Sequence, residues 1–322
     1  MVFAAVHRRR AAGIALGVLA DAAFGDPQRG HPVAVFGSGA AALERRCYAD
    51  SRVAGVGHAG TLLAAVTLTS AGMGRLGRRS ALAEVVWIAA ATFTALGGTS
   101  LARTGDRMAD LLGAGDLAAA RDLLPSLCGR DPSVLDSGGL ARAALESIAE
   151  NTSDAQVGPL LWAALGGAPG VLLYRAANTL DAMVGNKSPR YRRFGWAAAR
   201  FDDLLNLAAA RLTGLLVVVC APLVGGSPVG AIRAWRSDAA RHPSPNAGVA
   251  EASFAGALRI QLGGPTQYAH ELEIRPTLGT GRPPRAGDLR RAVRLSRAVQ
   301  VAAAAAAVSV ACRIGRPVCP QA

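Results

Sequence analysis

LNLAAARLTGLLVVVCAPLVG, residues 205–225, is an almost unbroken apolar run. A helix that crosses a membrane needs about 20 mostly apolar residues, and this run has that length. The runs at 58–74 and 81–98 come close to it, and the run at 298–312 is somewhat short. Together they predict an all-α, polytopic integral membrane protein, in which amphipathic and loop segments connect several transmembrane helices.

The composition agrees with that fold class. Of 322 residues, 51% are hydrophobic and 18% are charged, whereas soluble domains carry about 25% charged residues. The apolar content is mostly Ala, Gly, Leu and Val, and small residues let helices pack closely. A soluble, Ala-rich helical enzyme is the alternative. Alternating β-branched runs are few, so strands are at most a minor element, and residues 1–322 are expected to form one integrated domain.

Two apolar segments depart from a simple span. The segment at 11–24 is short and bounded by acidic residues, so its place in the membrane is left open. The segment at 157–177 contains GGAPG, and Pro169 with its flanking glycines predicts two half-helices, the second beginning near Pro169. A re-entrant or surface-lying hairpin would have the same pattern. Residues 99–156 predict amphipathic helices, and 226–296 predict mostly loop with short helices.

The chain is strongly basic, with a formal net charge of +13. Its arginines cluster beside the apolar runs, as in HRRR at 7–10 and RYRR at 190–193, which is typical of segments that contact membrane lipid. No basic face with groove-reading or aromatic elements accompanies them, so nucleic acid is not a predicted partner. Both segments that flank 205–225 are basic, so the positive-inside rule leaves the topology open. The five cysteines form no C-x-x-C pair and are expected to be buried thiols.

The first polar cluster is ESIAENTSD, residues 146–154. Glu146, Glu150 and Asp154 follow one another at helical spacing, and like charges at i, i+4 cost about 0.2–0.5 kcal/mol. A Mg²⁺ ion held through carboxylates and substrate phosphates would compensate that repulsion. A solvated helix end is the simpler interpretation, but Asn151, Thr152 and Ser153 add donors that such an end does not require.

The second cluster is NTLDAMVGNKSPRYRRFGW, residues 178–196. Asn178 and Asp181 lie one helical turn apart. Lys187 is the only lysine of the chain, and its compact charge suits contact with phosphate or carboxylate; survival of one lysine by chance in a loop explains it equally well. GNKS resembles the end of a phosphate-binding loop, but Asn186 and Asp181 occupy two required glycine positions.

Two further groups of polar residues stand out. Asp202 or Asp203, with Asn206, lies at the mouth of the apolar run 205–225. Ionisable residues at such places are usually functional, although side chains at a helix mouth can also reach water. Asn246 and Glu251 are polar candidates in HPSPNAGVAEASFAGAL, residues 242–258.

These motifs occur together in one known family. ESIAENTSD, NTLDAMVGNKSPRYRRFGW, ARFDDLLN, SPNAG, LGGP and the N-terminal GDP…HPV follow one another between about residue 16 and residue 314. In this the chain resembles the CobD/CbiB family of cobalamin biosynthesis, the adenosylcobinamide-phosphate synthases. Three positions depart from the family pattern as we expect it: Ala155, Ala209, and Val249 with Ala250. None of them removes a charged or amide group.

The resemblance implies a multi-pass enzyme of the cell membrane. Such enzymes join (R)-1-aminopropan-2-ol, or its O-phosphate, to a propionate carboxylate of adenosylcobyric acid, and ATP with Mg²⁺ drives the amide bond. Other enzymes of the corrinoid pathway are further candidate partners. A membrane transporter and a non-catalytic scaffold for those enzymes remain as alternatives.

With that chemistry, the polar clusters take three sets of expected roles. The expected catalytic residues are Glu150, Asp154 and Lys187. The expected substrate- and phosphate-binding residues are Asn151, Thr152, Ser153, Asn178, Arg190, Arg193, Asn206 and Asn246. The expected Mg²⁺ ligands are Glu146, Glu150, Asp181, Asp202 and Asp203.

Overall fold

The computed structural model describes residues 2–27, 30–77, 80–267 and 272–313. The chain folds into two compact units. Unit 1 comprises residues 1–97, 158–205 and 303–322, and unit 2 comprises 98–157 and 206–302. The chain therefore passes between the units several times, and neither is one continuous segment. One integrated domain stays a prediction, because an interleaved chain is compatible with one domain or with two.

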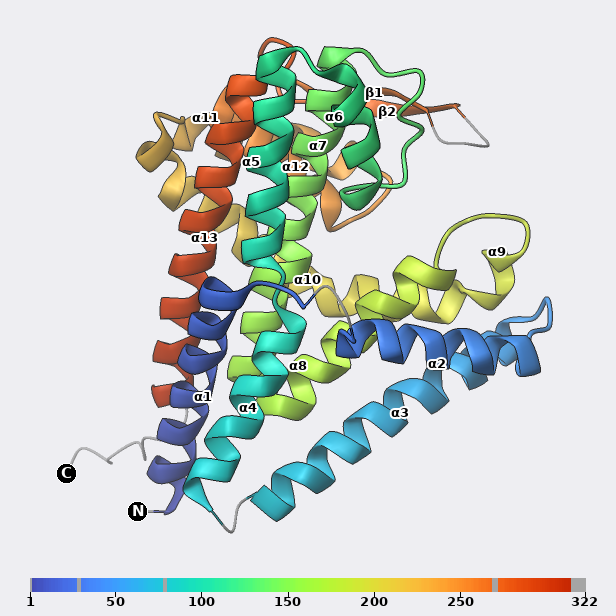
Figure 1. Ribbon diagram of the computed structural model, residues 1–322, viewed down its shortest axis with the longest axis vertical. Helices are drawn as coiled ribbons and strands as arrows, with labels where there is room; N and C mark the ends of the chain where they lie inside the picture. The colour runs from blue at the N-terminus through green and yellow to red at the C-terminus, as the bar shows by residue number, and fades with distance from the viewer. Residues whose placement is uncertain (1, 28–29, 78–79, 268–271, 314–322) are drawn as a thin grey trace. The chain divides into compact units, whose positions relative to one another are not determined.

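Unit 1 is built of helices. They are α1 (Val2–Phe24), α2 (Pro32–Cys47), α3 (Arg52–Gly77), α4 (Ala81–Ala95), α8 (Gly158–Val184) and α9 (Tyr191–Phe194), with the first part of α10 (Trp196–Cys220) and the end of α13 (Ala286–Arg313). Helix α1 lies along α4, and α3 and α4 both pack on α8 (Figure 1). Glycines make the first of these contacts possible: a Cβ at Gly13 or Gly17 would lie 2.7 Å from the side chain of Ile88 or Thr92.

The predicted break in α8 is confirmed. Gly167 has φ 61° and ψ −150°, outside the helical region, and Pro169 follows inside the same long helix. The break frees backbone carbonyls, and the Arg10 guanidinium donates hydrogen bonds to the carbonyl oxygens of Ala164 and Leu165, at 3.1 Å each. An arginine thus satisfies the acceptors that a kinked apolar helix leaves without a partner.

Unit 2 combines helices with a small hairpin. Its helices are α5 (Gly98–Ala114), α6 (Leu117–Leu123), α7 (Ser137–Thr152), α11 (Pro228–Asp238) and α12 (Ala247–Leu258), with most of α10 and of α13. A π-helical turn, η2 (Ser153–Val157), follows α7. Short 3₁₀ turns lie at Leu124–Ser126, Ala221–Val224 and Ala239–Arg241. Strands β1 (Leu262–Gln267) and β2 (Leu272–Leu278) pair antiparallel, with an irregularity between Leu262 and Gly264.

The prediction that 226–296 is mostly loop is wrong. This segment contains α11, α12, the hairpin and the beginning of α13. The glycines of this segment predicted loops, but several of them allow helices to pack closely. A Cβ at Gly256 of α12 would lie 2.1 Å from the carbonyl oxygen of Gly230 of α11, so these two helices cross at glycines.

Among the described residues, five helical segments are long and apolar enough to cross a membrane. They are Arg52–Gly77, Ala81–Ala114, Ser137–Val184, Trp196–Val224 and Ala286–Arg313. They include the predicted runs at 58–74, 81–98, 157–177 and 298–312 and nearly all of 205–225, whereas 11–24 lies in α1, outside the five. The chain is therefore a mostly α-helical, multi-pass membrane protein, as the apolar runs predict.

Candidate functional site

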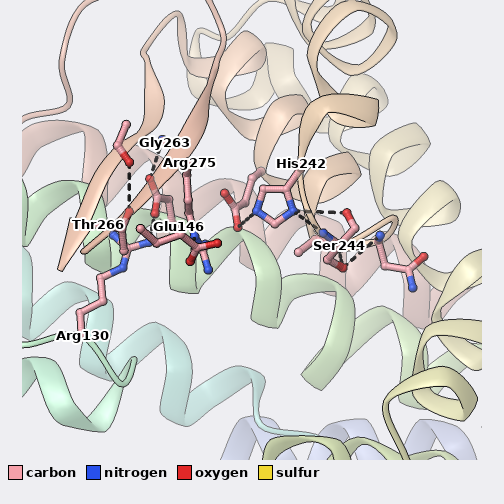
Figure 2. Close-up of polar contacts among 12 residues, drawn as sticks. Arg130, Glu146, His242, Ser244, Gly263, Thr266 and Arg275 are labelled. Carbon is pink, nitrogen blue, oxygen red and sulfur yellow. Dashed lines mark hydrogen bonds and ion pairs between the residues drawn. The ribbon is translucent and has the colours of Figure 1, made fainter. Parts of the chain in front are cut away.

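A buried polar cluster in unit 2 begins on α7. Asp136 caps this helix by accepting a hydrogen bond from the Gly139 N–H at 2.7 Å. Two and a half turns later, Glu146 forms an ion pair with Arg130 through one carboxylate oxygen and accepts the Gly263 N–H at 2.7 Å through the other (Figure 2). Its side chain is 3% exposed. These contacts explain the burial of Glu146 without a metal ion, and they fasten α7 to the loop before it and to β1.

Glu150, one turn further along α7, differs sharply from Glu146. It is exposed, and within the described residues its carboxylate makes no hydrogen bond. The neighbouring Asn151 donates to the Ser147 carbonyl at 2.9 Å, and Ser147 in turn donates to the Leu127 carbonyl at 2.7 Å. Of the two glutamates, Glu150 is therefore the one available to a ligand.

The residues that follow form the π-helical turn, a structure often found at functional sites. Thr152 and Ser153 are fully buried, and Asp154 is half-buried. The Thr152 hydroxyl lies 2.7 Å from the Ser296 hydroxyl of α13, which also accepts a hydrogen bond from the Gln156 amide at 2.9 Å. Thr152 is thus engaged within the protein, and the wider turn changes the register at which Asp154 follows Glu150.

The start of α12 adds a second set of polar residues. Ser244 accepts the Ala247 N–H at 3.2 Å and Asn246 accepts a hydrogen bond from the Arg211 guanidinium at 2.8 Å. His242 lies close by, and a Cβ at Gly248 would come within 2.5 Å of the His242 Cβ. Only a residue without a side chain lets the loop fold back on the helix here, and this brings His242 toward Glu251.

His242 and Glu251 are buried together. The imidazole Nε2 lies 3.7 Å from a Glu251 carboxylate oxygen, and the two side chains are 4% and 1% exposed. Burial, strengthened by the nearby charges of Glu146 and Glu150, raises the pKa of Glu251 well above its ordinary value. Burial lowers the pKa of His242. Both groups are therefore driven toward their neutral forms, as expected for poorly solvated ionisable groups.

Figure 2 shows the cluster as a whole, with Arg130, Glu146 and Gly263 to one side of His242 and Ser244 to the other. Arg275 of β2 reaches into the same cluster and donates to Glu273 at 3.3 Å. Within unit 2 the cluster thus draws on α7, α12, the hairpin and the loops that precede both helices.

The remaining predicted residues lie in unit 1. Lys187 is exposed and, within the described residues, makes no hydrogen bond or ion pair; its charge acts through space on Asp203. Asp203 forms a 3.5 Å ion pair with Arg200. The other residues predicted here are half-buried or buried: Asn178, Asp181 and Asp202.

Arg190, also in unit 1, is held by the protein itself. Its guanidinium donates to Glu44 at 3.0 Å and stacks 4.1 Å from the centre of the Tyr48 ring. Arg193 pairs loosely with Asp50 at 3.8 Å, with both side chains largely exposed. The phosphate-binding role predicted for these two arginines stays a prediction.

Unit 2 brings together only part of the predicted site. Glu146, Glu150, Asn151, Thr152, Ser153, Asp154, Asn206 and Asn246 belong to unit 2, and the others belong to unit 1. Sequence reasoning missed Arg130, His242 and Arg275 and gave Glu251 no role. Only His242 carried a signal, because it opens the motif that contains Asn246.

The comparisons with known proteins bear on the whole chain. A family model described as CobD/Cbib protein matches residues 14–296. Cobalamin biosynthesis protein CobD of Mycobacterium tuberculosis is 63% identical over 312 residues, which cover 97% of this chain and 99% of that protein. The chain belongs to the CobD/Cbib family. Proteins of the same name from Pelobacter propionicus and Geobacter metallireducens are 44% and 46% identical to it, over 83% and 81% of this chain and 84% of each relative. No solved structure matches.

Membership of the CobD/Cbib family places the chain in cobalamin biosynthesis and confirms the resemblance drawn from the motifs. The Mg²⁺ ligands stay a prediction. Among the described residues, no group of three or more His, Cys, Asp or Glu side chains is arranged to hold a metal ion. The donor set still fits Mg²⁺ bound by one or two carboxylates, with phosphate and water oxygens as its other ligands. Glu150 in unit 2 and, separately, the Asp203 carboxylate in unit 1 are each suited to that role.

Proposed function

We propose that this protein is an ATP-dependent amide ligase of the cell membrane. Its substrates are adenosylcobyric acid and (R)-1-aminopropan-2-ol or its O-phosphate. The CobD/Cbib family membership supports the pathway. The observation that carries the chemistry is the polar cluster of unit 2, where an exposed glutamate without a hydrogen bond, Glu150, adjoins buried carboxylates and two arginines.

The proposed reaction has two steps. The propionate carboxylate takes the γ-phosphoryl group of ATP, and ADP leaves. The amine nitrogen then attacks the acyl carbon, and phosphate leaves as the amide forms. Mg²⁺, when bound, supplies neutralising charge for the phosphates, because phosphoryl transfer depends mainly on positioning and electrostatic stabilisation.

The residues of this chain have separate tasks in that scheme. Glu150 contacts the amine, and Asp154 supports it from the π-helical turn of unit 2. Lys187 belongs to unit 1 and is expected to bind a phosphate. Glu146 holds the cluster together through Arg130 and the Gly263 N–H.

The test is product analysis of membranes that contain the protein. Membranes are incubated with adenosylcobyric acid, aminopropanol or aminopropanol phosphate, and Mg-ATP, and the corrinoids are analysed by mass spectrometry. We expect an amide adduct that requires ATP and is absent from membranes without the protein. Uptake of a corrinoid into sealed vesicles without any adduct would favour the transporter. Neither an adduct nor uptake would favour the scaffold.

A further inference from the structure

Two buried polar atoms near Glu150 have no partner. The Glu251 Oε2 and the His242 Nε2 make no hydrogen bond, although both side chains are almost fully buried. Nearly all buried polar groups in proteins are hydrogen-bonded, so such atoms require an explanation. The 3.7 Å between the Nε2 and the other Glu251 oxygen is too long for a hydrogen bond.

The charges around this pair are unbalanced. Glu146 is paired with Arg130, and Arg275 is hydrogen-bonded to Glu273. Glu150 has no such partner within the described residues. Five other charged groups act on the pair: the carboxylates of Glu146, Glu150 and Glu273 and the guanidiniums of Arg130 and Arg275. Counting Glu251 and Glu273, carboxylates exceed guanidiniums by two, and a bound cation would reduce that excess.

We propose that Glu150, Glu251 and His242 bind the ammonium group of the amine substrate; this assignment rests on the proposed function. A primary ammonium group has three N–H donors and no acceptor. The Glu150 carboxylate and the Glu251 Oε2 can supply two acceptors once Glu251 is ionised. The His242 Nε2 supplies a third in the tautomer whose Nδ1–H donates to the Ser244 carbonyl at 3.2 Å. An ammonium group suits this set better than Mg²⁺, because His242 contributes a nitrogen atom and Mg²⁺ prefers oxygen ligands.

The same groups prepare the amine for attack. In the empty protein, burial and the charges of Glu146 and Glu150 raise the pKa of Glu251, which favours its neutral form. A bound ammonium favours the ionised carboxylate, because an opposite charge nearby stabilises it, so Glu251 loses its proton to solvent. One N–H proton of the ammonium then passes to the Glu251 carboxylate. The nitrogen keeps the electron pair and can attack the acyl carbon.

This scheme predicts a proton count that does not depend on catalysis. Each amine that binds as ammonium releases one proton from Glu251. Isothermal titration calorimetry of the detergent-purified protein with (R)-1-aminopropan-2-ol, near neutral pH in buffers of different ionisation enthalpy, measures that count. We expect close to one proton released per amine bound, and no binding of uncharged propane-1,2-diol.

Variants separate the proposal from a merely structural role. Glu251→Gln keeps the shape of the neutral acid and should fold. It should bind the amine on the order of 10–100-fold more weakly and release no proton. His242→Gln should weaken binding while proton release continues. Asp122→Asn removes an exposed carboxylate of α6 in the same unit and should change neither quantity.

Several results would overturn the proposal. They are amine binding without proton release, wild-type binding by Glu251→Gln, and Mg²⁺ binding that requires Glu251 while amine binding does not. The corrinoid assay keeps the two proposals apart. Proton-linked amine binding without any amide product would contradict the proposed function and leave the ammonium site standing, whereas amide formation by Glu251→Gln at the wild-type rate would do the reverse.

Discussion

Glu146→Gln tests whether the cluster of unit 2 depends on the buried ion pair. The substitution keeps an oxygen that can accept the Gly263 N–H, but it removes the carboxylate charge that pairs with the Arg130 guanidinium, whose side chain is 6% exposed. Breaking a buried ion pair by removing one partner costs about 3–5 kcal/mol. At roughly 2–3 °C per kcal/mol for a large domain, the melting temperature should fall by about 6–15 °C.

Thermal unfolding in detergent, followed by tryptophan fluorescence at one fixed scan rate, measures this change; the fixed rate matters because unfolding in detergent is often irreversible. Asp110→Asn is the matched control, since it breaks an exposed 2.6 Å ion pair with Arg290 in the same unit and should cost at most about 1 kcal/mol. Arg130→Gln combined with Glu146→Gln should be less destabilised than the sum of the single variants.

The reasoning is refuted if Glu146→Gln melts within about 2 °C of the wild type, because removing one partner of a buried ion pair has to destabilise the fold. Unchanged stability together with an altered Mg²⁺ dependence would instead support Glu146 as a metal ligand.

Three other variants test separate features. Glu251→Gln should gain stability relative to the wild type as the pH rises from about 5 to about 8. Because the pKa of Glu251 is raised, the folded wild type binds more protons than the unfolded state, and its stability declines above the ordinary carboxyl pKa. A constant difference between the two melting temperatures across that range would contradict this. Lys187→Arg should lose on the order of 10²–10³ in amide-forming rate, and Lys187→Ala should lose no less. An arginine variant within a few-fold of the wild type would mean that Lys187 supplies only positive charge at the surface. Gly263→Ala should destabilise the fold by more than about 1 kcal/mol, because φ is +80° and the new Cβ would lie 2.0 Å from the Pro276 carbonyl oxygen. Gly166→Ala serves as the control, because its new Cβ meets nothing within 4 Å.

Much of the fold could be predicted because it depends on local pattern. Apolar length identifies the candidate spans, and Pro169 with its glycines identifies the break in α8. The hairpin and α12 were missed because glycines there serve two different purposes. Gly256 allows close helix packing, and Gly263 takes a left-handed backbone conformation in β1. Sequence alone does not separate these uses from a flexible loop.

The candidate site was predictable only in part, because its partners lie far apart in the chain. The spacing of Glu146 and Glu150 placed both on one helix, but it did not show that one is buried against Arg130 and the other is exposed. Arg275 enters from the hairpin, and no periodicity points to it. Glu251 was visible as a polar residue in an apolar helix, and its significance depends on the burial of its carboxylate beside His242.

The central claim is that this protein forms an amide bond at the expense of ATP, and one measurement tests it most directly. Purified protein in nanodiscs is given adenosylcobyric acid, aminopropanol or its O-phosphate, and Mg-ATP, while the amide product and ADP are quantified in the same samples by mass spectrometry. We predict equal amounts of amide and ADP for the wild type, and a collapse of both for a folded Glu150→Gln variant. Intact ATP with no adduct, or a Glu150→Gln variant that turns over at the wild-type rate, would contradict the account.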